Sequence, residues 1–161
     1  MVTIDTYHWN GFLDCLDGLL YTREVQSMRT LPHHVGNCYE HSVFVAYLAY
    51  RLGCHWGLDI KACARGGLLH DLYLYNGRDR SAHPGSQCLD HPEFALRNAR
   101  ALLPDLTEKE ANIIQAHMWP LAIHMPHSKE AWTVSLADKI CACLEVVGVF
   151  RRTRVRAMLA A

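Results

Sequence analysis

The sequence lacks an excess of charge of either sign and any long hydrophobic run. Its 161 residues carry 16 Lys and Arg against 16 Asp and Glu, so the formal net charge is zero. No overall field therefore favours a nucleic-acid polymer or an anionic membrane surface. No uninterrupted apolar run approaches the roughly 18 residues that a membrane span needs. We expect neither a membrane nor a nucleic-acid polymer among the partners.

Signals for disulfides, zinc fingers and secretion are also missing. The chain has seven cysteines, an odd number, and none of them form a CxxC pair. The N-terminal stretch MVTIDTYHWN has no basic segment followed by an apolar one, so it is unlike a signal peptide. We therefore expect reduced thiols, most of them small core residues, in a cytoplasmic protein.

Strand-like alternation is scarce, and most of the chain repeats its apolar residues at helical spacing. Asp59 and Asp90 are candidate N-caps, Gly53 is a candidate helix end, and Thr107 with Glu110 matches a capping box. Pro92 is expected in the first turn of its helix. The predicted helices cover residues 5–28, 39–53, 59–75, 91–102, 107–118 and 129–147.

The chain shows no internal repeat and no sign of a second domain. Its length suits one compact domain, and we expect a single all-α domain over residues 1–161. An N-terminal helix and loop would occupy 1–32, and a short C-terminal helix 148–161. The stretch at 76–90, NGRDRSAHPGSQCLD, is longer than a connection requires. It is expected to be a lid or a binding segment, with disorder as the alternative.

Histidine is the residue that the sequence has in abundance, with 11 copies against 4 Phe. A single histidine on an apolar helix face is usually a hydrogen-bonded core residue, but here the candidates recur on separate predicted helices. Asp138 is the most informative, because a carboxylate within the apolar stretch TVSLADKICACL needs a strong partner, and a cation is the simplest one. Imidazoles and carboxylates without a thiolate suit iron, manganese or zinc. The candidate ligands are His41, His70, Asp71, His91, His117 and Asp138.

The order His, then His-Asp, then Asp resembles the HD-domain phosphohydrolase superfamily, through His41, the pair His70-Asp71, and Asp138. The resemblance extends over about residues 33–147. YEHSVFVAYLAYRL and ARGGLLHDLYLY resemble the two helices that carry the first ligands, and HPEFALRNA resembles the helix that opens with His-Pro in members with two metals. HMWPL and SLADKICACLE resemble an uncharacterised bacterial HD subfamily.

This resemblance implies a helical bundle that hydrolyses a phosphomonoester or phosphodiester, with nucleotides among the candidate substrates. It implies His70 and Asp71 as the catalytic pair and one or two divalent ions as cofactors. The chain resembles, more distantly, HD enzymes that split dinucleoside tetraphosphates. Di-iron oxygenases and non-catalytic nucleotide sensors also occur in the superfamily, and both stay open as alternatives. The implied ligands are His41, His70, Asp71 and Asp138 for the first ion and Asp71, His91 and His117 for the second, with Asp71 bridging.

Four further residues are candidates for contacting an anionic substrate. Arg78 and Arg80 lie in the long loop, where closure over a phosphate and plain solvation are both reasonable. Lys139 follows Asp138 but points away from it on an ideal helix. His33 and His34 both precede the first ligand helix, and His34 is the one predicted to line the site. Histidine near this position is usually followed by Gly in the resembling subfamily, whereas Val35 follows here.

Overall fold

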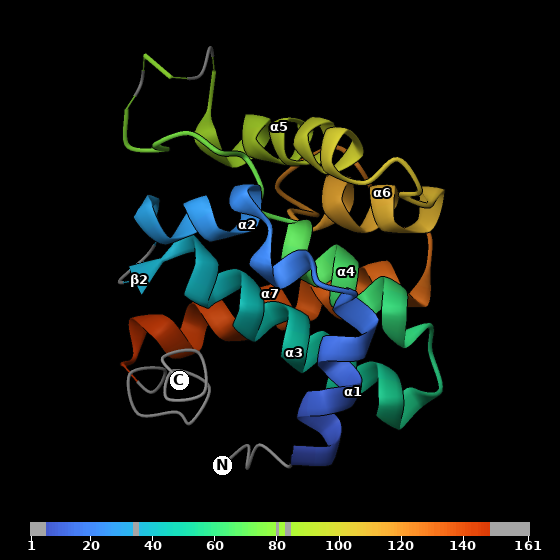
Figure 1. Cartoon of the computed structure of the whole chain (residues 1–161). Helices are drawn as coiled ribbons and strands as arrows, with labels where there is room; N and C mark the ends of the chain where they lie inside the picture. The colour runs from blue at the N-terminus through green and yellow to red at the C-terminus, as the bar shows by residue number, and fades with distance from the viewer. Residues whose placement is uncertain (1–5, 34–35, 80, 83–84, 149–161) are drawn as a thin grey trace.

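A computed structural model describes residues 6–33, 36–79, 81–82 and 85–148, and most of these residues are helical (Figure 1). The α-helices are α1 (Thr6–Leu16), α2 (Arg23–Ser27), α3 (Cys38–Trp56), α4 (Ile60–Leu69), α5 (Gln87–Leu102), α6 (Glu108–Ala116) and α7 (Lys129–Val146). Two 3-10 turns, Leu19–Tyr21 and Met28–Thr30, flank α2, and strand β1 (Pro32–His33) pairs with β2 (Gly36–Asn37) in a small antiparallel hairpin. The all-α prediction is confirmed.

Helix α4 packs against α3, α6 and α7, and two adjacent glycines allow this close packing. A Cβ atom added at Gly67 would lie 2.8 Å from the Cα of Ala46 in α3. A Cβ atom at Gly66 would lie 2.6 Å from Cγ2 of Ile113 in α6. The backbone of α4 therefore approaches both helices directly, which brings the His-Asp pair at its end beside them.

The core between α1 and α3 is aromatic. Phe12 of α1 is fully buried, and its ring centroid lies 5.4 Å from that of Tyr47 and 5.7 Å from that of Tyr50 in α3. Burying a side chain of this size stabilises a fold by about 1.5–3 kcal/mol. The contact holds one face of α3 against α1, while the face that carries His41 turns toward α7.

Several helix boundaries follow the capping residues that the sequence indicated. Asp59 caps α4 by accepting a hydrogen bond from the N–H of Ala62 at 3.0 Å. Thr107 and Glu110 form the expected capping box at the start of α6. The helix predicted over 129–147 agrees with α7 to within one residue.

The predicted helix over 5–28 is wrong as one continuous element. The chain leaves the helical path after Leu16, where Asp17 and Gly18 adopt φ angles of 48° and 78°. This left-handed backbone ends α1 and lets the following turns fold back over the core.

The ends of the next two helices also differ from the prediction. Helix α3 continues past Gly53 and is closed by Gly57, whose φ of 66° is the left-handed conformation that ends a helix. The helix predicted to reach 75 ends at Leu69, with His70 as its C-cap. The His-Asp pair thus lies where the chain turns out of the helix.

The fourth predicted helix starts one turn too late. Helix α5 begins at Gln87 after Ser86, whose carbonyl accepts hydrogen bonds from the amides of Leu89 and Asp90 at 2.9 Å. Asp90 is therefore inside the helix and is not its cap, and Pro92 lies beyond the first turn. Helix α6 ends at Ala116, two residues before the predicted end. The predicted C-terminal helix falls largely outside the described residues.

None of the helices that the structure describes combines the length and the apolar character that crossing a membrane requires.

Candidate metal centre

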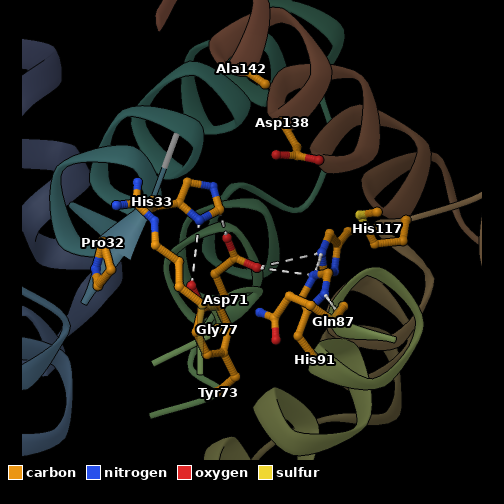
Figure 2. Close-up of a pocket in the computed structure, with 12 residues that line it drawn as sticks. Pro32, His33, Asp71, Tyr73, Gly77, Gln87, His91, His117, Asp138 and Ala142 are labelled. Carbon is orange, nitrogen blue, oxygen red and sulfur yellow. Dashed lines mark hydrogen bonds and ion pairs between the residues drawn. The ribbon is translucent and has the colours of Figure 1, made fainter. Parts of the chain in front are cut away.

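Side chains from five parts of the chain meet in one buried cluster around Asp71, and Figure 2 shows His91, His117 and Asp138 beside this carboxylate. The helices α3, α5 and α7 and the C-terminal ends of α4 and α6 all contribute to it. Most of these groups are almost completely removed from solvent, with His70 at 0 % and Asp71 at 2 % exposure. The structure thus brings together all six predicted ligands: His41, His70, Asp71, His91, His117 and Asp138.

Asp71 divides the cluster into two sides. Its Oδ2 lies 3.5 Å from Nε2 of His70 and 4.0 Å from Nε2 of His41. Its Oδ1 lies 3.3 Å from Nε2 of His91 and 3.6 Å from Nε2 of His117. We refer to these as the Oδ2 side and the Oδ1 side. One carboxylate therefore faces two separate groups of imidazoles.

Asp138 of α7 completes the Oδ2 side. Its Oδ1 lies 3.1 Å from Nε2 of His41 and 3.7 Å from Nε2 of His70. The Oδ2 side thus has two imidazoles between two carboxylates, a set of donors that suits a divalent cation.

Hydrogen bonds to the backbone orient three of the histidines. His70 and His117 occupy the same position, as C-caps of α4 and α6. The Nδ1–H of each donates to a carbonyl oxygen three residues earlier at 2.7 Å, and that of His91 donates to one four residues earlier at 2.6 Å. Because a carbonyl only accepts, the proton of each neutral ring sits on Nδ1. The Nε2 lone pairs consequently face the cluster, as in metal-binding histidines.

His41 is oriented by a carboxylate that sequence reasoning missed. Its Nδ1–H donates to Oε1 of Glu145 at 2.8 Å, and Glu145 is itself buried. Glu145 follows Asp138 by seven residues, or two helical turns, so both carboxylates lie on one face of α7. That spacing was the available signal. A carboxylate behind a histidine raises the basicity of the ring and fixes its tautomer.

The separations between the carboxylate oxygens and the histidine nitrogens fit a bound ion. Two ligand atoms that are each about 2.1 Å from one ion lie about 3.0 Å apart at a right angle and about 4.2 Å apart when opposite. The distances that join Asp71 and Asp138 to the four histidines, 3.1–4.0 Å, all lie within this window. Within the described residues, His70 Nε2 and Asp71 Oδ1 are buried without a hydrogen-bond partner. A cation would satisfy both.

The charges in the cluster depend on one another. Burial alone would lower the pKa of His41, but hydrogen bonds with Asp138 and Glu145 outweigh burial and raise this pKa to about 10. Burial alone would raise the pKa of Asp71 and of Asp138, but the surrounding histidines hold both well below the usual range.

The two histidines of the Oδ1 side shift in opposite directions. Burial, together with the neighbouring His70 and His91, lowers the pKa of His117 to about 3. Burial opposes protonation of His91 as well, but Asp71 outweighs it and raises the pKa of this ring. Their Nε2 atoms are 2.8 Å apart, so without an ion a proton on one ring bridges the two. Protons and metal ions therefore compete for this cluster.

The cluster lies within a span of the chain that matches a protein-family model. The HD domain model matches residues 38–143, about two thirds of the chain. The chain belongs to the HD domain family. All six predicted ligands of this HD domain lie inside the matched span, and Glu145 lies two residues beyond it. No curated protein and no solved structure matches the chain.

A cavity of about 360 Å³ opens onto the HD cluster. Asp71, His91, His117 and Asp138 line it, together with the aromatic and apolar side chains of Tyr73, Met118 and Ala142. The predicted substrate residue Arg78 also lines this cavity. A molecule in the cavity would therefore contact the candidate metal ligands directly.

The other predicted substrate residues are placed differently. The ammonium group of Lys139 donates to the carbonyl oxygen of His117 at 2.9 Å and to the carbonyl and hydroxyl oxygens of Ser135 at 3.2 and 2.8 Å. It thereby joins the end of α6 to α7, and a contact with substrate remains only a prediction. His34 and Arg80 lie outside the described residues.

His33 is the second site residue that the sequence reasoning passed over. It lines the cavity from β1, and its Nε2 lies 3.5 Å from Oδ2 of Asp71. Successive side chains of a strand point to opposite faces, so the direction of the His33 side chain depends on the register of the hairpin. Nothing in the sequence specified that register.

Proposed function

We propose that this HD-domain protein is a metal-dependent hydrolase that cleaves a phosphomonoester or phosphodiester, with nucleotides as the first substrates to test. The observation that carries the proposal is the position of Asp71, a buried carboxylate whose two oxygens face two separate sets of imidazole nitrogens. A carboxylate in this position can bridge two ions, which is the arrangement that many phosphate-cleaving enzymes use.

The distances from the two oxygens of Asp71 divide the candidate ligands between two ions. His41, His70 and Asp138 would hold one ion with the Oδ2 of Asp71, and His91 and His117 the other with its Oδ1. When bound, such ions lower the pKa of coordinated water toward about 7 and neutralise charge on phosphoryl oxygens. Imidazole and carboxylate ligands favour iron, manganese or zinc.

The cavity has a volume and a lining that suit a small phosphate ester. Its volume of about 360 Å³ lies near the lower end of the range of about 300–1,000 Å³ that is typical of ligand pockets. The guanidinium of Arg78, an exposed residue of the lining, matches the geometry of phosphate oxygens. Tyr73 and Met118 provide wall surface for the organic part of the ester. The proposed roles of these residues are thus to orient the ester against Asp71 and its histidines.

The test compares metal-depleted protein with protein reloaded with iron, manganese or zinc. The substrates are p-nitrophenyl phosphate, bis-p-nitrophenyl phosphate, nucleoside monophosphates and dinucleoside tetraphosphates, with release of p-nitrophenol, phosphate or nucleotide as the readout. We expect hydrolysis only in the reloaded protein. Asp71→Asn should reduce it to background, while His124→Ala should leave it unchanged, because His124 is 40 % exposed and pairs with Glu93.

The same samples separate this proposal from the other activities known in the superfamily. Oxygen consumption by the iron-loaded protein, with no hydrolysis of any ester in any metal form, would overturn the proposal and indicate a di-iron oxygenase. Tight nucleotide binding without turnover would overturn it in favour of a sensor.

A further inference from the structure

A histidine outside the span that matches the HD model lies within the metal centre. His33 precedes that span by five residues and belongs to β1. Its Nε2 is 3.5 Å from Oδ2 of Asp71, and its ring centroid is 4.3 Å from that of His41. Figure 2 shows His33 across Asp71 from His91 and His117, so it belongs to the Oδ2 side.

We propose that His33 is an additional metal ligand on the Oδ2 side. The inference rests on the metal centre of the proposed function, although it does not depend on which substrate is cleaved. His33, His41 and Asp71 each offer one ligand atom, and these three atoms lie within 4.8 Å of one another. The separation of 3.5 Å between His33 and Asp71 falls inside the window of about 3.0–4.2 Å that two ligands of one ion occupy.

The ring of His33 is oriented in the same way as the other histidines. Its Nδ1 lies 3.5 Å from the hydroxyl oxygen of Tyr73, a buried side chain that follows Asp71 by two residues. Its Nε2 points at the carboxylate. All five histidines around Asp71 thus place Nδ1 against an oxygen atom and Nε2 toward the cluster, which is the pattern that outer hydrogen bonds impose on metal ligands.

The hairpin fixes this histidine in place next to α3. His33 pairs with Gly36 across the two strands, and the carbonyl of Leu31 accepts the N–H of Cys38 at 2.9 Å. Asn37 then caps α3 by accepting the N–H of Glu40 at 2.9 Å. The hairpin therefore leads directly into the helix whose first turns carry His41.

An added ligand increases the difference between the two sides of the centre. The Oδ2 side would have His33, His41, His70 and Asp138 in addition to Asp71, whereas the Oδ1 side has only His91 and His117. Catalytic metal sites keep a coordination position open for water or substrate. We therefore assign the tighter ion to the Oδ2 side and the more open one to the Oδ1 side.

The test measures the Oδ2 side alone, in a His91→Ala background that removes a ligand from the other side. The dissociation constants of Mn²⁺ and Zn²⁺ are obtained by competition with a chelator of known affinity, for His91→Ala and for the double variants that add His33→Ala or His33→Gln. Loss of an outer hydrogen bond to a ligand already costs about 10–100-fold in affinity. We expect at least a tenfold weakening from either substitution at His33, and none from His124→Ala.

A second readout is the visible absorption of the Co²⁺-loaded proteins, which responds to the number of nitrogen ligands. It should differ between His91→Ala and both His33 double variants. Circular dichroism and thermal unfolding of the metal-free proteins check that each variant is folded. If the His33→Ala variant does not fold, the His33→Gln variant, which keeps a polar side chain of similar length, provides the test.

Two results would overturn the inference. One is a dissociation constant for the His33 variants within about twofold of the background. The other is a raised KM with unchanged metal affinity, which would make His33 a substrate contact. Because metal binding is measured without substrate, failure of the proposed hydrolase activity leaves a His33-dependent metal affinity standing, and the two failures are distinguishable.

Discussion

Glu145 tests whether the centre is built for a metal ion, because its carboxylate touches the cluster only through His41. It accepts the Nδ1–H of His41 at 2.8 Å through Oε1. Its Oε2 is buried and has no hydrogen-bond partner within the described residues. Glu145→Gln keeps the shape of the side chain and one acceptor oxygen, and it removes the negative charge behind the imidazole.

The expected effect on metal affinity follows from that single contact. Changing an outer-shell partner of a metal ligand costs about 10–100-fold in affinity. Glutamine still accepts the hydrogen bond, so we expect the lower end of this range, about tenfold or about 1.4 kcal/mol. The loss should be confined to the Oδ2 side, since His91 and His117 donate to backbone carbonyls instead.

The assay is chelator competition with Mn²⁺ or Zn²⁺, and Glu130→Gln is the matched control. Glu130 is also a buried glutamate of α7, but its Oε1 accepts the N–H of Asp59 at 3.1 Å. The control should bind both ions as the unchanged protein does. Equal metal affinities for Glu145→Gln and the unchanged protein would refute the reasoning, since they would show that the carboxylate does not act on a metal ligand.

Three other predictions concern protons, pH and packing. Metal binding at pH 7 should release about one proton or more per ion, since His41 with its pKa near 10 and His91 with its raised pKa hold protons that an ion displaces. Calorimetry in buffers of different ionisation enthalpy measures this proton release. A binding enthalpy that does not depend on the buffer would contradict the prediction. The metal-free protein should lose stability as the pH rises from about 6.5 toward 10, because the pKa of His41 is raised from 6.5 to about 10 on folding and its contribution is complete only below the unfolded value. Urea unfolding at pH 6.5 and 9.5 tests this. In the metal-loaded protein the ring keeps only the Nδ1 proton that it donates to Glu145 and has no Nε2 proton to lose, so this protein should lack the His41 contribution to that change. Gly67→Ala should destabilise the fold by about 1–3 kcal/mol, because its Cβ would lie 2.8 Å from the backbone of Ala46; an unchanged melting temperature would show that α3 and α4 separate at little cost.

Much of the candidate site was predictable from residue order. The six candidate ligands lie on five predicted helices, and an inward-facing carboxylate such as Asp138 needs a cationic partner wherever the helices meet. The prediction for the residues around Asp138 was less accurate than the prediction that this carboxylate needs a cationic partner. Leu136 and Ile140 were grouped with it in an apolar stretch, yet they are 47 % and 38 % exposed and lie on the outer face of α7. The local pattern indicated that Asp138 needs a cation, but it did not indicate which residues of α7 face the core.

What the sequence left undetermined depends on contacts between distant segments. The direction of the His33 side chain depends on hairpin register, which alternation of side chains does not reveal in a pair of two-residue strands. The prediction for His34 lies outside the described residues. The break after Leu16 depends on the left-handed backbone at Asp17, a residue type compatible with a helix as well. Glu145 was the exception, because its seven-residue spacing from Asp138 already placed both carboxylates on one helix face.

The central claim is that Asp71 joins two metal ions, and elemental analysis of the purified protein tests it most directly. The protein is prepared without chelators and without a metal-binding tag, next to Asp71→Asn and the control His124→Ala. The account predicts about two equivalents of metal in the unchanged protein and in the control, and well under one in Asp71→Asn, because each Asp71 oxygen lies within 4.0 Å of the imidazoles on its own side. Absence of bound metal even after reconstitution with iron, manganese or zinc would contradict the account, and so would full metal content in Asp71→Asn.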